Sequence, residues 1–295
     1  MTKVRVKAVQ AEPGWNDLQA SVAKTIKLIK EAGEKGINVL GFPEVWIPGY
    51  LWSLWTSSPI NNVELFHQYM ANSLARNSPE MDAIKAAVKE AGIFTSFISP
   101  EGEIVHHRRK LKPTHVEWSL WGNAQADSVQ TVVDSPFGKI GALNCWEHLQ
   151  PLLRYYEYKQ GVQIHVASWP PMFPLAKGVP GTGIRACLYA DSHQGQPSQA
   201  EFGRGGDDSG ARRGFSMIFG PDGTPLVEAP PAGVECILQA DIDLQSIGYA
   251  KAMADPNAGR NDTGRALSIL HGRDRFIFNL LHKIRVFVFF KIITS

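Results

Sequence analysis

Segments with the apolar spacing of strands alternate with segments that have the apolar spacing of helices along most of this chain. Residues 4–10 alternate apolar and polar side chains, as a half-buried strand does, and residues 16–33 carry apolar side chains on one helical face. Further strand-like segments lie at residues 37–42, 92–99, 103–107, 129–133, 139–144, 162–168, 214–220, 224–228 and 234–241. This alternation predicts an α/β (α+β) fold in which helices cover two sheets.

The expected helices begin and end at residues with known capping preferences. Asn16 is the expected N-cap of the first helix. Ser78, followed by Pro79, begins a second helix, and Gly92 ends it. A third helix is expected over residues 147–160, where apolar and polar residues follow a helical pattern.

Length and composition favour one compact domain in a reducing compartment. The 295 residues are 44% hydrophobic and 20% charged, enough for one large core, and no linker or internal repeat divides them. A net charge of +2 predicts neither nucleic-acid binding nor strong membrane attraction. The cysteines, Cys145, Cys187 and Cys236, are widely spaced and odd in number, which favours a reducing cytoplasm. The chain enters its first strand without a long apolar segment, so no secretory signal is expected.

Cys145 stands where an expected strand meets an expected helix. The apolar run of residues 139–144 ends at this thiol. At such a junction a thiol is exposed at the carboxyl edge of a sheet, where helix-terminal N–H groups can lower its pKa and bind a developing oxyanion. A lone cysteine in an intracellular chain is more often inert core, so the thiol alone does not establish a function.

Two other segments supply charged partners for such a thiol. Glu44 follows the strand-like residues 37–42 and lies between Pro43 and Pro48, so a stiff turn holds its carboxylate. The basic run of residues 106–117 ends in an acid. Taken alone, Glu44 fits a solvated loop charge, and the basic run fits a solvated face or an anion patch. Together with the thiol they provide a general base, a cation and a nucleophile.

Three segments resemble, in the same order, the signature segments of the nitrilase branch of the carbon–nitrogen hydrolase superfamily. They are Phe42-Pro-Glu44, the run Arg108-Arg-Lys-Leu-Lys-Pro-Thr-His-Val-Glu117, and Leu143-Asn-Cys-Trp-Glu-His148. The similarity extends over the connecting sequence, across residues 4–169 and again across residues 214–256. It implies the superfamily's four-layer α-β-β-α sandwich in a single domain.

The resemblance also implies a role for each candidate residue. The expected roles are general base for Glu44, transition-state cation for Lys110, nucleophile for Cys145 and supporting second acid for Glu117. Lys110 is preferred because family members place this lysine directly after an arginine and three residues before a proline, and Lys112 is the alternative. Negative charge that builds on the substrate nitrogen could be stabilised by Lys110 and the Trp146 N–H.

The expected reaction is cofactor-independent hydrolysis of an organic nitrile to a carboxylic acid and ammonia. Thiolate attack gives a thioimidate, which water converts first to a thioester and then to the acid. If the tetrahedral intermediate expels the thiol instead, the product is an amide, so a cyanide or nitrile hydratase is the alternative. No metal is assigned, because His106, His107 and His115 lack metal-ligand spacing.

The expected partners are a small-molecule nitrile and further copies of the chain. Apolar residues at helical spacing within positions 61–74 exceed what one domain needs to bury; they are Val63, Leu65, Phe66, Tyr69 and Met70. Family members associate through such surfaces, so a homo-oligomer is expected. No stable membrane insertion is expected, because basic side chains interrupt the apolar C-terminal tail.

Aromatic and histidine side chains near the motifs have two interpretations each. The aromatic residues Trp46, Trp52, Trp55, Trp118 and Trp121 pack in the core or form an apolar substrate wall with Tyr50. His148, three residues after the thiol, could form a Cys/His dyad, but a packing or hydrogen-bonding role is the more common one.

Three segments depart from the family pattern. One inner strand is apparently missing between Ile93 and Glu103, and residues 172–213 are rich in Gly, Ser, Asp and Arg and read as disordered. A hydrolase domain is therefore expected over residues 1–256, followed by an atypical tail, residues 257–295, that we expect to fray. An inactive paralogue or the product of a wrongly predicted gene is the alternative to an active enzyme.

Overall fold

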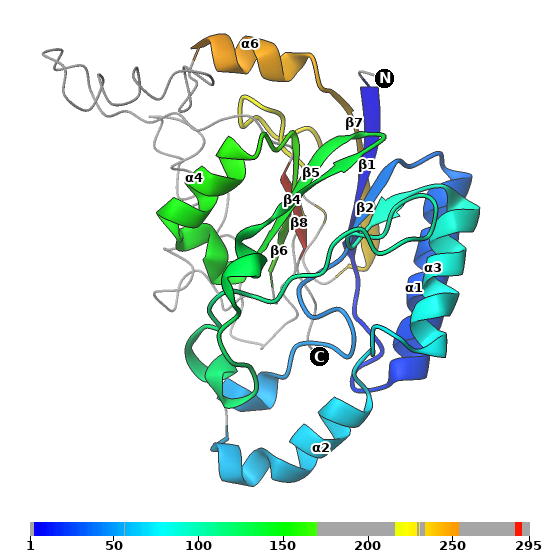
Figure 1. Cartoon of the computed structure of the whole chain (residues 1–295). Helices are drawn as coiled ribbons and strands as arrows, with labels where there is room; N and C mark the ends of the chain where they lie inside the picture. Colours follow the sequence, from blue (N-terminus) through cyan, green and yellow to red (C-terminus); the bar gives the residue numbers. More distant parts are fainter. Residues whose placement is uncertain are drawn as a thin grey trace, which may run out of the picture.

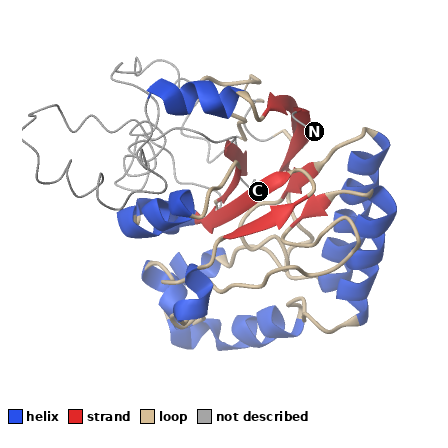
Figure 2. Cartoon of the chain, turned by 45° about the horizontal axis from the view of Figure 1, so that its top comes forward, coloured by secondary structure: helices blue, strands red, loops and turns tan. Residues whose placement is uncertain are grey.

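The computed structural model describes residues 3–55, 57–169, 216–228, 230, 234–253 and 287–290. Two four-stranded sheets stack face to face between helices, with α1 and α3 on one side and α4 on the other (Figure 1). Figure 2 shows the strands at the centre and helices on both sides. The predicted α-β-β-α arrangement is confirmed. The expected disorder of residues 172–213 lies outside the described residues.

The first sheet has the strand order β3-β2-β1-β7. Strand β1 (Lys3–Gln10) pairs in parallel with β2 (Val39–Gly41), and β2 pairs in parallel with β3 (Phe94–Thr95). Strand β7 (Cys236–Asp243) runs antiparallel to β1 over its whole length. Alternate residues of β7 are buried and exposed, the pattern of an edge strand with one face on the core.

The second sheet has the strand order β4-β5-β6-β8. Strands β4 (Val132–Ser135) and β5 (Gly138–Asn144) form the expected hairpin, and β6 (Ile164–Ser168) lies parallel to β5. Strand β8 (Phe287–Phe290) lies parallel to β6. It comes from the tail that the sequence suggests is frayed, so that expectation is wrong for these four residues.

Helix α1 (Leu18–Glu34) begins one residue later than predicted. Its N-cap is Asp17, whose side chain accepts a hydrogen bond from the Ala20 N–H. The expected cap, Asn16, instead has φ +50°, and its own N–H donates to the Pro48 carbonyl. The prediction of Asn16 as the cap is therefore wrong, because Asn16 belongs to the preceding turn.

Helix α3 (Pro79–Ala91) begins and ends as predicted. The Ser78 side chain accepts from the Met81 N–H, and Gly92 ends the helix in the left-handed region with φ +65°. Buried residues of α3 and α1 pack together over the first sheet. Local capping signals were sufficient here, because both ends depend on neighbouring residues alone.

The helix predicted over residues 147–160 is interrupted. A 3-10 helix, η5 (Cys145–Leu149), comes first, and α4 (Pro151–Lys159) begins at its proline. Gln150 between them is extended, as is favoured for a residue before proline. The other described helices are α2 (Val63–Ala71), α6 (Ser246–Met253), η1 (Trp52–Trp55), η2 (Pro59–Asn62), η3 (His115–Ser119) and η4 (Ala126–Val129). Among the described helices, none is long and apolar enough to cross a membrane.

The strands predicted between residues 92 and 107 are much reduced. Only β3 remains, followed by isolated bridges from Ile98 to Thr95 and to Ile104. Ser96 and Phe97 both have positive φ, 48° and 60°, so the chain reverses directly after β3. This tight reversal lies where the sequence indicates a missing strand.

The carboxyl ends of β2, β5 and β6 lie at the same edge of the sandwich, where the motif segments follow them. The hydroxyl of Ser168, the last residue of β6, donates to the Phe42 carbonyl, 3.0 Å away, just after β2. This bond ties the two sheets together at that edge. Ligand sites of open α/β sheets form at such strand ends.

Candidate active site

Glu44 lies in the turn after β2 and is almost fully buried, 4% exposed. Val45 beside it has φ +51°, a conformation that a β-branched residue rarely adopts. The Gly49 N–H donates to the Val45 carbonyl at 3.0 Å, and the Ile47–Pro48 peptide is cis. Among the described residues, no donor meets Glu44 Oε2, so one buried carboxylate oxygen is available to accept a proton.

Lys110 connects two buried carboxylates. Its Nζ donates to Glu44 Oε1 at 2.8 Å and to Glu117 Oε2 and Oε1 at 2.8 and 3.1 Å. These contacts use all three N–H groups of the ammonium. Lys112, the alternative cation, is exposed. The geometry therefore brings Lys110, and not Lys112, to the two acids.

Glu117 is held in place by its own local structure. It lies in η3, where Thr114 is the N-cap of a capping box. The Thr114 N–H donates to Glu117 Oε2 at 2.7 Å, and the Tyr50 hydroxyl donates to Oε1 at 3.1 Å. Tyr50 thus supports the acid through its hydroxyl group.

Cys145 is the first residue of η5 at the end of β5, and it is 4% exposed. Its φ of +49° is unusual for a side chain with a Cβ, and such strain collects at functional sites. Burial and the carboxylates of Glu44 and Glu117 raise the pKa of the thiol, while Lys110 and a hydrogen bond from the Trp146 N–H lower it. The N–H group acts in the expected direction, but burial outweighs it, so the net pKa of the thiol is raised.

Glu44 and Lys110 also shift each other's pKa values. Burial raises the pKa of Glu44 to about 7, although the charge of Lys110 opposes the shift. Burial alone would lower the pKa of Lys110, but the charges of Glu44, Cys145 and Glu117 raise it above its ordinary value. Near neutral pH the site therefore holds an ammonium, a protonated thiol and a carboxylate that exchanges its proton easily.

A second buried ion pair braces the thiol against the lysine segment. Arg108 donates from Nη1 and Nη2 to Glu147 Oε2 and Oε1, at 2.9 and 2.5 Å. Glu147 also accepts from the N–H groups of Leu111 and Asn144, at 2.9 and 3.0 Å. Sequence reasoning missed this brace, although the spacing of Asn144 and Glu147 matches a capping box.

The remaining aromatic residues have separate roles. Trp46 is core, and its Nε1–H donates to the Thr25 hydroxyl at 2.7 Å. Trp121 packs on a small cluster that includes Tyr69 of α2, and Trp118 is half exposed. The side chains of Trp52 and Trp55 lie outside the described part of the structure.

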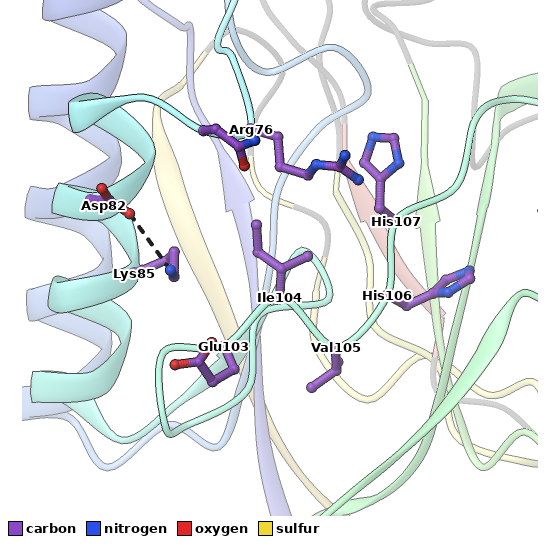
Figure 3. A pocket seen from close by; sticks show the side chains of 9 residues that line it. Arg76, Asp82, Lys85, Glu103, Ile104, Val105, His106 and His107 are labelled. Atoms are coloured by element: carbon purple, nitrogen blue, oxygen red, sulfur yellow. Dashed lines mark ion pairs between the residues drawn. The ribbon is translucent and has the colours of Figure 1, made fainter.

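A pocket of about 760 Å³ beside α3, which we call the α3 pocket, is lined by none of the four site residues (Figure 3). Its charged and histidine side chains are Arg76, Asp82, Lys85, Glu103, His106 and His107. Within the described ranges, no group of three or more His, Cys, Asp and Glu could hold a metal ion.

Comparison with known proteins identifies relatives over most of the chain. The carbon–nitrogen hydrolase family model matches residues 5–252. A nitrilase of Talaromyces marneffei is 51% identical over 294 residues, covering 85% of this chain and 90% of the relative. A cyanide hydratase of Armillaria gallica is 39% identical, covering 85% and 80%. A crystal structure of a carbon–nitrogen hydrolase from Helicobacter pylori has a TM-score of 0.62 at 17% identity, covering 92% of this chain and 99% of that one, and so shares the fold.

Proposed function

The chain belongs to the nitrilase branch of the carbon–nitrogen hydrolase family, and from this premise we propose that it is a cofactor-independent nitrilase. The substrate is an organic nitrile, and the products are a carboxylic acid and ammonia. One observation carries the proposal: Lys110 bridges two buried carboxylates beside a buried thiol, with one oxygen of Glu44 free of a described partner. Two relatives named nitrilase, at 51% and 44% identity, support the nitrile as substrate.

The first step joins the thiol to the nitrile carbon. Glu44 accepts the proton of Cys145 as the sulfur attacks, so no free thiolate has to persist in the buried site. Charge builds on the nitrile nitrogen, where Lys110 and the Trp146 N–H stabilise it. The proton passes from Glu44 to that nitrogen, and the product is a neutral thioimidate on Cys145.

The later steps add two waters. Glu44 activates the first water, which adds to the thioimidate carbon and gives a tetrahedral species that carries a hydroxyl, an amine and the sulfur. Expulsion of ammonia leaves a thioester, and a second water releases the acid and restores the thiol. Glu117 keeps Lys110 oriented throughout, because it accepts two of the three ammonium hydrogen bonds.

The product depends on which group leaves the tetrahedral species. If sulfur leaves before ammonia, the enzyme releases an amide and acts as a hydratase. The relative named cyanide hydratase, at 39% identity, keeps this outcome as the second candidate. An inactive paralogue is the third, and it predicts no release of ammonia or amide.

Incubation with a panel of nitriles and cyanide tests the proposal. Purified protein should release ammonia and acid in equal amounts, and Cys145→Ala should release neither, because a methyl group fills the site of the thiol but cannot attack. Cys236→Ala is the matched control, since Cys236 is a free, half-buried thiol on β7. Amide in place of acid would reassign the enzyme as a hydratase. Turnover by Cys145→Ala, or no turnover by the wild type, would refute the proposal.

The proposal also includes how the protein assembles and in which compartment it works. We infer a homo-oligomer because Val63 and Met70 of α2 remain 46% and 70% exposed, although Tyr69 of the same helix turns inward. The free thiols of Cys145 and Cys236 fit a reducing compartment such as the cytoplasm. Light scattering on purified protein tests the assembly, and a strictly monomeric species would contradict it.

A further inference from the structure

A buried chain of hydrogen bonds ends at the carbonyl of the thiol residue. Glu157 of α4 contacts His165 of β6, with 2.9 Å between Oε1 and Nδ1. His165 Nε2 lies 3.0 Å from His148 Nε2, and His148 Nδ1 lies 2.7 Å from the Cys145 carbonyl oxygen. Glu157 and His165 are fully buried, and His148 is 4% exposed. We call these three side chains the buried relay.

The contacts of the buried relay fix how many protons it holds. A carbonyl only accepts, so His148 Nδ1 must carry a proton. The contact between the two Nε2 atoms needs one proton, and so does the contact between His165 and Glu157. Two neutral histidines and an ionised glutamate together carry only two protons. The relay therefore holds a third, either on Glu157 or as an imidazolium, and its net charge is zero.

The backbone makes room for this carboxylate. A Cβ at Gly141 of β5 would lie 2.5 Å from Glu157 Oε1, well inside contact distance. Gly141 is the cross-strand neighbour of His165. Residues of β5, β6 and α4 thus accommodate the buried relay. A local contact of η5 alone would not require them.

The relay acts on the peptide that joins Cys145 to Trp146. In a trans peptide the C=O and the N–H point in opposite directions. A hydrogen bond that holds the Cys145 oxygen therefore fixes the direction of the Trp146 N–H, and it polarises that N–H into a stronger donor. The same N–H hydrogen bonds the Cys145 sulfur and is the proposed backbone donor to the substrate nitrogen.

We propose that Glu157, His165 and His148 are positioning residues that aim and strengthen the Trp146 N–H as the oxyanion donor. This inference rests on the proposed function. His148 is not a general base here, because its Nδ1 is occupied by the Cys145 carbonyl and its Nε2 by His165. His148 therefore does not form the Cys/His dyad considered from the sequence. It supports a site made of Cys145, Glu44 and Lys110.

Kinetics of paired variants test the proposal. His148→Phe should lower kcat about tenfold with little change in KM, because the donor acts mainly in the transition state. His148→Asn, whose amide N–H replaces Nδ1–H, should recover much of the loss. Glu157→Leu should behave as His148→Phe, and Glu157→Gln, which donates to His165 as a protonated glutamate would, should recover most of the rate.

A matched control separates positioning from simple loss of stability. Leu153→Ala removes a buried side chain of α4 one helical turn before Glu157 and should leave kcat unchanged in protein that remains folded. An equal loss of kcat in Leu153→Ala, or no recovery in both His148→Asn and Glu157→Gln, would overturn the proposal.

A second measurement does not need turnover. The rate of alkylation of Cys145 by iodoacetamide, followed by peptide mass, reports its thiolate over a range of pH. His148→Phe should move this profile to higher pH, because a weakened Trp146 N–H stabilises the thiolate less, and His148→Asn should move it back. An unmoved profile would overturn the positioning role. Failure of the wild type to hydrolyse nitriles would refute only the proposed function.

Discussion

The candidate active site, at the carboxyl ends of the strands, and the α3 pocket contain the same kinds of charged side chain. The two regions differ in how far water reaches those side chains. In the site, the side chain of Lys110 is 13% exposed, and those of Glu44 and Glu117 are 3% and 2% exposed. In the α3 pocket, the pair between Lys85 and Asp82 spans 3.6 Å with side chains that are 28% and 73% exposed (Figure 3).

The difference in exposure determines how strongly the charges in each region interact. Two unit charges 4 Å apart interact by about 1 kcal/mol in water and by about 4 kcal/mol at the effective dielectric of a protein surface, more where water is excluded. One basic run serves both regions, since His106 and His107 line the pocket while Lys110 enters the site. Burial and convergence, and not the local density of charge, therefore distinguish the charged cluster of the candidate active site from the polar surface of the α3 pocket.

The largest effect is expected at the buried brace. Arg108→Met should lower the free energy of unfolding by about 3–5 kcal/mol, because it leaves the Glu147 carboxylate buried without its cation. Arg76→Met in the α3 pocket should change it by less than about 0.5 kcal/mol. Urea denaturation measures both. Similar small changes for the two variants would contradict the contrast between buried and open charge.

Glu44→Gln should stabilise the fold in a pH-dependent way. Burial raises the folded-state pKa of Glu44 from its ordinary 4.5 to about 7, so the stability that protonation confers is complete below about pH 4.5 and is lost as pH rises through about 7. The variant should gain up to about 3 kcal/mol at pH 8 and less than about 1 kcal/mol at pH 5. Glu103→Gln should show no such trend, and a gain independent of pH would argue against a buried, titrating Glu44.

Lys110→Gln should lower kcat about a hundredfold or more, since the substrate nitrogen loses its cation. Lys85→Gln in the α3 pocket should stay within about twofold of the wild type, because an exposed pair contributes little. Lys112→Gln should cost less than Lys110→Gln. A larger loss in Lys112→Gln would move the cation to that residue.

The pH dependence of kcat/KM should follow Glu44. The base must be ionised, so the rate should rise about tenfold per pH unit below pH 7 and level off above it, given a pKa of about 7. Glu103→Gln should leave the profile unchanged. A rise centred near pH 4.5 would show that the essential base is a solvated carboxylate.

The smallest effect is expected at the exposed ion pair between Asp82 and Lys85. Asp82→Asn should change the free energy of unfolding by less than about 0.5 kcal/mol, because water already screens its contact with Lys85. The change should shrink further in high salt. A loss above about 1 kcal/mol would mean that the α3 pocket holds its charges as firmly as the site does.

Local signals in the sequence predicted the parts of the fold that depend on neighbouring residues. Ser78 and Gly92 mark the ends of α3, and the turn after Ser135 joins the two strands of the hairpin. The resemblance predicted that Glu44 and Lys110 belong to one site, and Lys110 Nζ lies 2.8 Å from Glu44 Oε1. These predictions needed no knowledge of long-range packing.

Other features depend on contacts that no local pattern encodes. Strand β8 joins its sheet from far along the chain, and the brace between Arg108 and Glu147 joins two motifs 39 residues apart. The raised pKa of Cys145 reflects burial by surrounding elements, which spacing does not report. The pairing of His148 with His165 joins residues from η5 and β6, and neither residue shows a distinctive periodicity.

Trapping the covalent intermediate tests the central claim most directly. Wild type and Glu44→Gln are incubated with a nitrile substrate and quenched in acid, and the modified peptide is located by mass. We expect an adduct on Cys145 in both, with slow formation and accumulation in Glu44→Gln, because that variant lacks the base for thiol attack and for water addition. Substrate turnover with the adduct on Cys236, or an adduct that turns over at the wild-type rate in Glu44→Gln, would contradict it.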